Sequence, residues 1–352
     1  VYFAASDQND KRPDDTVIFR YDTRTDSRQL LGTLRGISQA QGNLEPDESI
    51  GKIHVSFMEH RGKMYFSSHD YHDIKSDYSD MYERRGGHFY AFDLKKETFE
   101  DLSVTDNYGV SVPYQGIIAM DILRSQNKLA GFTFPMGDLL IYDLRSRRTT
   151  FYPGVPEYRM RNVAREIWAT RKGKVYFTYA EPDFWIWELD IKTGVIRRTE
   201  QRNIVSHGFL HGMVATDDGK TVYLTDNDGH LFAFDTKRES LRDLGLLLPD
   251  DEIADGREIQ FVNGLTLSRD GRRLYSLPCE FEGGGSPALY EYDTKTGAKR
   301  CLARFPALDG GTVTGNGVID NAGRLYYGYH VYDTDSADEP RVQLLQVIPA
   351  ES

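Results

Sequence analysis

Hydrophobic and polar positions alternate along this chain in short runs, and many of these runs close on an acidic residue. Each run carries two or more apolar or aromatic residues, and the acidic residue opens a turn. Six runs follow this pattern, at residues 18–22, 89–93, 140–143, 185–190, 231–235 and 289–293. Their closing aspartates lie 45 to 71 residues apart, which indicates a repeated supersecondary unit.

A second strand recurs in each repeat after a turn that contains Gly or Asn. It lies at residues 63–66, 128–129, 174–177, 221–224, 273–275 and 324–327. Residues 1–4 fit the same slot and make a seventh copy. One more short strand precedes each complete copy, and a polar-apolar strand follows the acidic turn. With no helical periodicity of useful length, the sequence predicts an all-β fold, a seven-bladed β-propeller of four-stranded antiparallel blades.

We expect one domain over residues 1–352. The first blade lacks its innermost strand in this pattern, and the last lacks an outer one. Either both termini complete the ring, or a strand precedes residue 1.

Composition limits what the protein can bind. A hydrophobic content of 39%, with 22 Tyr and 18 Phe, supports a large core, and no apolar segment is long enough for a membrane span. The net charge of -11 argues against nucleic acid, whose binders carry a basic stripe. It still allows an acidic sugar in a local cationic pocket. Two cysteines are too few for a disulfide framework and have no zinc spacing.

Aligning the innermost strands by repeat places six polar residues at one equivalent position. The six residues are His54, Gln115, Arg165, His211, Asn263 and Asn316. Since these strands line the axis of a propeller, we expect the six to converge at one mouth of the channel. Asn or Gln before Gly is explained by turn formation alone. Two His and an Arg in the same slot favour a site, because ionisable groups on a converging wall must be paired or bind a ligand.

The second strands run back to the same face and add further candidates. These are His69, Tyr179, Tyr329 and His330, with His72 in the loop just beyond His69. His54, His69 and His72 belong to one blade, which favours acid–base chemistry or a metal. His60 and His230 lie in turns, where we expect them to be solvated.

This set of groups suits an anionic, hydroxyl-rich ligand such as a uronic acid. A guanidinium at Arg165 would hold the carboxylate with two parallel bonds and make the adjacent C5 proton more acidic. His54 and His69 are then the base and the acid of an elimination, with Tyr179 or Tyr329 as a substitute for either. A glycosidase normally needs two facing carboxylates, and the aligned axial positions contain none.

One blade also resembles a known family. Its sequences Gly51-Lys52-Ile53-His54 and Gly62-Lys63-Met64-Tyr65-Phe66-Ser67-Ser68-His69 resemble the paired-histidine blade of seven-bladed polysaccharide lyases that attack uronic acids. These lyases include the ulvan lyases and the L-rhamnose-α-1,4-D-glucuronate lyases. The latter are similar to α-L-rhamnosyl-glucuronate hydrolases on the same propeller.

The resemblance implies β-elimination at glucuronate, with His54 and His69 as acid and base and Arg165 neutralising the carboxylate. His72 is an alternative to His69. The related hydrolases act through a histidine early in the chain, and no histidine precedes His54 here, which favours the lyase. Chain length favours the rhamnosyl-glucuronate group over the ulvan lyases.

The resemblance implies a monomeric extracellular or periplasmic enzyme acting on arabinogalactan-type glycans such as gum arabic. Its partner would be an acidic oligosaccharide or polysaccharide that contains glucuronate. Several such propellers hold a divalent cation such as Ca²⁺, and His207, His211 or the acidic loop 70–80 offers ligands here, although no spacing requires one. A hydrolase or an ulvan lyase on the same fold, a non-catalytic scaffold, and a metal-dependent lactonase or antibiotic lyase remain as alternatives.

Overall fold

The computed structural model describes most of the chain. For residues 107, 163–165, 202, 311–312, 314, 330–331 and 341–342 it gives the backbone alone. The described residues are 1–6, 16–46, 48, 50–69, 79–159, 163–179, 185–202, 212–226, 228–259, 262, 264–278, 287–306, 311–331 and 341–349. The chain divides into two compact units, Val1–Pro182 with Trp187–Arg197, and Asp183–Ile186 with Arg198–Ser352.

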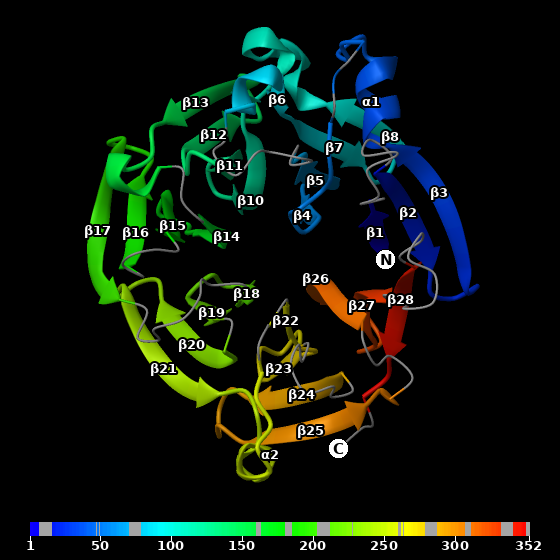
Figure 1. The fold of residues 1–352 in the computed structure, drawn as a ribbon, viewed down its shortest axis with the longest axis vertical. Helices are drawn as coiled ribbons and strands as arrows, with labels where there is room; N and C mark the ends of the chain where they lie inside the picture. Colours follow the sequence, from blue (N-terminus) through cyan, green and yellow to red (C-terminus); the bar gives the residue numbers. More distant parts are fainter. Residues whose placement is uncertain are drawn as a thin grey trace. The chain divides into compact units, whose positions relative to one another are not determined.

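The first four blades are antiparallel sheets whose strands follow one another in order (Figure 1). The strands of the first two sheets are β1 (Tyr2–Ala5), β2 (Val17–Asp22) and β3 (Ser27–Thr33), then β4 (Met58–His60), β5 (Lys63–Ser67), β7 (Phe89–Asp93) and β8 (Thr98–Asp101). Those of the next two are β10 (Gly116–Leu123), β11 (Lys128–Phe134), β12 (Leu139–Asp143) and β13 (Arg148–Tyr152), then β14 (Val163–Ala169), β15 (Lys174–Tyr179), β16 (Trp185–Asp190) and β17 (Val195–Arg202). A small ladder pairs β6 (Gly86–Gly87) with β9 (Val112–Pro113).

Three more blades follow. Their strands are β18 (Gly212–Ala215), β19 (Thr221–Thr225), β20 (His230–Asp235) and β21 (Ser240–Leu246), then β22 (Leu265–Leu267), β23 (Arg273–Ser276), β24 (Ala288–Asp293) and β25 (Lys299–Arg304), then β26 (Gly311–Ile319), β27 (Leu325–Val331) and β28 (Arg341–Val347). The protein is therefore a seven-bladed β-propeller, as the repeat pattern predicts. In the described part of the chain the first and last blades have three strands each, and the other five have four.

Helices are few and short. They are α1 (Leu34–Ala40) and α2 (Asp250–Ala254), with the single 3₁₀ turns η1 (Met81–Glu83), η2 (Leu102–Thr105), η3 (Asn107–Gly109) and η4 (Pro156–Tyr158). None of the helices among the described residues has the length and apolar character needed to cross a membrane.

The acidic residue that closes each third strand forms the turn that the sequence predicts. Asp93 Oδ1 accepts hydrogen bonds from the backbone N–H groups of Lys95 and Lys96, at 3.0 and 2.9 Å. Asp143 and Asp235 make the same pair of bonds. The aspartates therefore have a structural role, because a side-chain oxygen replaces the strand partners that the backbone loses in the turn.

Apolar side chains fill the spaces between neighbouring sheets. Phe132 of β11 packs against Phe177 of β15 with ring centroids 5.2 Å apart, and both rings are fully buried. Burying a side chain of this size stabilises the fold by about 2 kcal/mol. The core therefore ties β11 and its sheet to the sheet of β15.

Candidate functional site

His54 and His69 are brought together by a single backbone bridge. The N–H of Lys52 donates to the carbonyl of His69 at 3.1 Å, and the N–H of His69 donates back to Lys52 at 2.7 Å. The sequence alignment places His54 within an innermost strand, but it lies in an irregular segment before β4. Because the pairing is limited to this one bridge, His54 is not part of a strand ladder, and its side chain contacts His69.

The two imidazole rings meet edge to face. Their centroids are 5.4 Å apart and their planes lie at 70°. His54 Nδ1 is 3.0 Å from the backbone carbonyl oxygen of Ile118 in β10. Because a carbonyl only accepts, Nδ1 of His54 carries the proton and the lone pair of the neutral ring lies on Nε2. This tautomer is the one that a general base at Nε2 requires.

His69 is fixed by close packing. Its ring is 2% exposed and stands edge-on to Phe134 at 6.0 Å. A Cβ atom on Gly116 would lie 2.2 Å from His69 Nδ1, so only glycine allows the first residue of β10 to approach the ring this closely. The sequence explains Gly116 as a turn residue, whereas the structure shows that it also makes room for His69.

Gln115 joins a polar cluster beside the histidines. Its Nε2 donates to Asp138 at 2.9 Å, and its Oε1 accepts from the hydroxyl of Thr133 at 2.6 Å. Asp138 also accepts from Arg159, whose side chain is 34% exposed, at 3.1 Å. The amide of Gln115 is thus oriented by its neighbours. Asp138 and Arg159 were missed by the sequence analysis because neither occupies a repeated slot.

Tyr179 joins two loops through hydrogen bonds of its hydroxyl group. Its hydroxyl donates to the carbonyl of Gly137 at 3.2 Å and accepts from the N–H of Val155 at 3.0 Å. Its ring is fully buried and stacks on Tyr158 at 4.6 Å. Burial raises the pKa of Tyr179 far above its usual value, which keeps the phenol protonated. These contacts give the side chain a structural role.

The structure describes the side chains of only two of the remaining predicted site residues. Asn316 and Tyr329 belong to the second compact unit, where Asn316 Oδ1 accepts from the N–H of Leu265 at 3.1 Å and Tyr329 is fully buried in β27. Arg165 lies in β14 and His330 in β27, but their side chains are outside the described part. His72, His207, His211 and Asn263 also lie outside the described residues. The described residues alone contain no cluster of three His, Cys, Asp or Glu able to hold a metal.

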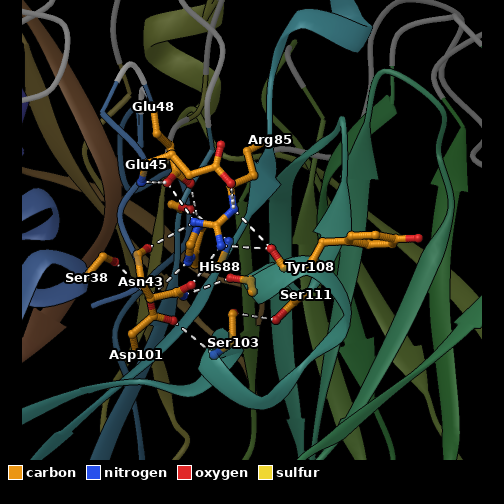
Figure 2. A network of polar contacts seen from close by, with 12 residues as sticks. Ser38, Asn43, Glu45, Glu48, Arg85, His88, Asp101, Ser103, Tyr108 and Ser111 are labelled. Carbon is orange, nitrogen blue, oxygen red and sulfur yellow. Dashed lines mark hydrogen bonds and ion pairs between the residues drawn. The ribbon is translucent and has the colours of Figure 1, made fainter. Parts of the chain in front are cut away.

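A buried polar network anchors the chain that leads into the His54 segment (Figure 2). His88 is fully buried between two carboxylates, with Nε2 3.0 Å from Glu48 and Nδ1 3.0 Å from Asp101. Arg85 adds an ion pair to Glu48 at 2.7 Å. Glu48 is six residues before His54, so the network holds this part of the chain against the second blade.

The two carboxylates of this network, Glu48 and Asp101, contact two cationic side chains, His88 and Arg85. Burial opposes a charge on His88, but the hydrogen bonds that it donates to Asp101 and Glu48 outweigh this effect and raise the pKa of His88 to about 9. Burial likewise opposes ionisation of Glu48 and Asp101, yet His88 lowers the pKa of both. The cluster therefore consists of a cationic imidazole between two anions at neutral pH.

Two weaker histidine predictions have different outcomes. His60 is buried, and its Nε2 lies 3.0 Å from Asn127 Oδ1, so the expectation that it is solvated was wrong. It packs under the neighbouring hairpin, which the sequence around a single turn does not reveal. His230 is partly exposed, with Nδ1 3.7 Å from Asp243 Oδ2.

Comparisons with known proteins support the fold. No protein-family model matches the chain. No curated protein matches its sequence. The solved structures that are similar include a candidate 6-phosphogluconolactonase from Bacteroides fragilis, which is 12% identical with a TM-score of 0.59 over 98% of this chain and 93% of that one.

Two structures of an extracellular domain from B. thetaiotaomicron are also similar. They belong to a candidate hybrid two-component system and a candidate one-component system. Both have a TM-score of 0.50, at 15% and 14% identity, and cover 85% and 87% of this chain. The matched regions are 33% and 34% of those longer chains. At such identities the likeness shows the fold alone.

Proposed function

We propose that the protein is a polysaccharide lyase that cleaves the L-rhamnose-α-1,4-D-glucuronate linkage of arabinogalactan-type glycans by β-elimination. The observation that carries this proposal is the pairing of His54 and His69, whose rings lie 5.4 Å apart. The hydrogen bond from His54 Nδ1 to a backbone carbonyl supports a base at Nε2. The choice of a glucuronate substrate rests on the resemblance of this blade to lyases that act on uronic acids.

In the proposed mechanism His54 Nε2 removes the C5 proton of glucuronate. The electron pair forms the C4–C5 double bond as the C4–O4 bond breaks, and His69 protonates the leaving oxygen of rhamnose. Arg165 neutralises the carboxylate and stabilises the enolate that develops on it, which is usually the largest contribution to such catalysis.

The product distinguishes the lyase from its closest alternative. The protein is incubated with gum arabic, and ultraviolet absorbance of a 4,5-unsaturated uronate is followed together with free rhamnose. We expect both to rise in equal amounts. Free rhamnose without the chromophore would indicate an α-L-rhamnosyl-glucuronate hydrolase instead. Activity on ulvan with none on gum arabic would indicate an ulvan lyase, and no product from either would favour a non-catalytic scaffold.

A sugar-lactone hydrolase is the second candidate. It is favoured by the similarity of nearly the whole fold to a candidate 6-phosphogluconolactonase. In such a reaction the same His54 Nε2 would activate water for attack on the lactone carbonyl. Proton release from 6-phosphogluconolactone above the uncatalysed rate, with no chromophore from gum arabic, would select this function.

A further inference from the structure

Two exposed tyrosines form a pair close to the histidines. Tyr82 of η1 is 69% exposed and Tyr114, after β9, is 45% exposed. Their ring centroids are 5.4 Å apart and their planes lie at 65°. Rings with this much exposed surface add little to the hydrophobic core. The pair is therefore available to a ligand.

The backbone at Tyr114 adds a second observation. Its φ of 62° lies in the left-handed region, which Gly and Asn adopt much more readily than an aromatic residue does. The N–H of Tyr114 donates to the carbonyl of Arg85 at 3.0 Å, which holds the turn into β10. This turn explains the left-handed backbone of Tyr114, but it does not require an aromatic side chain at this position.

The tyrosine pair lies beside the candidate site. Tyr114 is two residues before Gly116, the residue that packs against His69. Because successive Cα atoms are about 3.8 Å apart, the Cα atoms of Tyr114 and Gly116 are at most about 7.6 Å apart. A polymer bound at the histidines extends beyond the unit that is cleaved, and Tyr114 belongs to the segment that leads into the strand packed against His69.

We propose that Tyr82 and Tyr114 form a stacking subsite for a neighbouring sugar ring of the substrate chain. The inference rests on the proposed function, because it needs an oligosaccharide at His54 and His69. A phenol presents an apolar face with a polar hydroxyl at its edge, and this matches the C–H face and the hydroxyls of a pyranose. The edge-to-face contact holds the two rings at an angle before the sugar binds.

Tyr108 offers a matched control. It is 83% exposed and also left-handed, with φ of 60°. Its carbonyl accepts from Arg85 Nε and Nη2 at 3.0 and 2.8 Å, while its side chain extends away from the network (Figure 2). Tyr108 thus shares the exposure and the backbone of Tyr114, but the structure gives no ring contact between it and Tyr82.

The test measures binding by calorimetry with two probes, D-glucuronate and a glucuronate-containing tetrasaccharide prepared from gum arabic. Tyr114→Asn removes the ring but keeps a residue that tolerates the left-handed turn. We expect the wild type to prefer the tetrasaccharide, and Tyr114→Asn to weaken tetrasaccharide binding roughly three- to tenfold while leaving glucuronate binding unchanged. Tyr82→Ala should act in the same direction, and Tyr108→Asn should have no effect.

The outcomes separate the two proposals. A wild type that binds neither saccharide overturns both the proposed function and the subsite. A wild type that binds both probes equally, or a Tyr114→Asn variant that keeps the full preference for the tetrasaccharide, overturns the subsite alone. Thermal unfolding of each variant is measured in parallel, and a folded Tyr114→Phe that retains the preference supports a role for the ring itself.

Discussion

Two histidines of the second blade region show how the neighbours of a residue set its chemistry. His88 is held by the carboxylates of Glu48 and Asp101, which stabilise its charged form. His54 is instead oriented by the neutral carbonyl of Ile118, which fixes the tautomer and adds no negative charge. The first arrangement suits a permanent structural cation, and the second suits a group that takes up and releases a proton.

Replacing His54 tests the catalytic role. His54→Gln removes the lone pair at Nε2, and we expect turnover of gum arabic to fall by roughly 10²- to 10⁴-fold, the usual contribution of a general base. The measurement is the initial rate of chromophore formation. His60→Gln is the matched control, because His60 comes from the same blade but bonds to Asn127, and it should keep its activity. Equal losses in the two variants would contradict the assignment.

Gly116→Ala tests the packing behind His69. The new Cβ would lie 2.2 Å from His69 Nδ1, so the buried ring must move. Overpacking of this kind costs about 1–3 kcal/mol of unfolding free energy. We expect a folded variant whose kcat for gum arabic drops at least tenfold, since small misplacements of a catalytic group are costly. An unchanged kcat would show that the position of His69 is irrelevant to the reaction.

At the scale of elements, helix α1 and the segment after it are held to the second blade by residues that lie far apart in the sequence. Ser38 of α1 and Asn43 both donate to Asp101 at 2.8 Å, and Asp101 also pairs with His88. The segment before His54 is therefore positioned by a charged cluster as well as by the core. A buried cluster of this kind is strongly destabilised when one member is removed.

The pH dependence of stability follows from His88. Its pKa is about 9 in the folded protein and about 6.5 in the unfolded chain, so its stabilising charge is fully present below about pH 6.5 and is lost as the pH rises through about 9. A difference of about 2.5 pKa units corresponds to about 3 kcal/mol. We expect wild-type unfolding free energy to fall by this order between these pH values, and His88→Gln to lack that fall.

Urea unfolding at several pH values measures the effect. His60→Gln serves as the control, because burial lowers the pKa of His60 and its linkage runs in the opposite direction. It should keep the alkaline loss of stability. Parallel curves for the wild type and His88→Gln would mean that His88 is not charged in the folded protein.

The strands could be predicted from the sequence because their signals are local. Alternating apolar positions and a closing aspartate such as Asp93 are visible within a few residues. The pairing of Glu48 with His88, and the approach of Gly116 to His69, depend on contacts across 40 and 47 residues. Such contacts leave no periodic signal, so the sequence named the histidines of the site but not the groups that orient them.

At the scale of the whole molecule, the repeat defines the fold and also allows the blades to be compared residue by residue. Blades with equivalent strands have different residues at the inner position, and His54 stands where another blade has Gln115. The structure adds that these two residues have different tasks, since Gln115 is bonded to Thr133 and Asp138 whereas His54 faces His69. The two residues also differ in place, since Gln115 directly precedes β10 whereas His54 lies in the irregular segment before β4, so the slot in the alignment predicts neither their position nor their contacts.

The net charge of -11 leads to a prediction about how KM depends on ionic strength. An acidic polysaccharide is repelled by a negative protein until it reaches a local cationic pocket. Raising the ionic strength from about 0.01 M to about 0.15 M shortens the Debye length from about 30 Å to about 8 Å, which screens this repulsion. We expect KM for gum arabic to fall with added KCl while kcat stays constant. A glucuronate disaccharide, with a single charge, should show a smaller change, and a KM that rises with salt would mean that attraction by the cations of the site dominates the encounter.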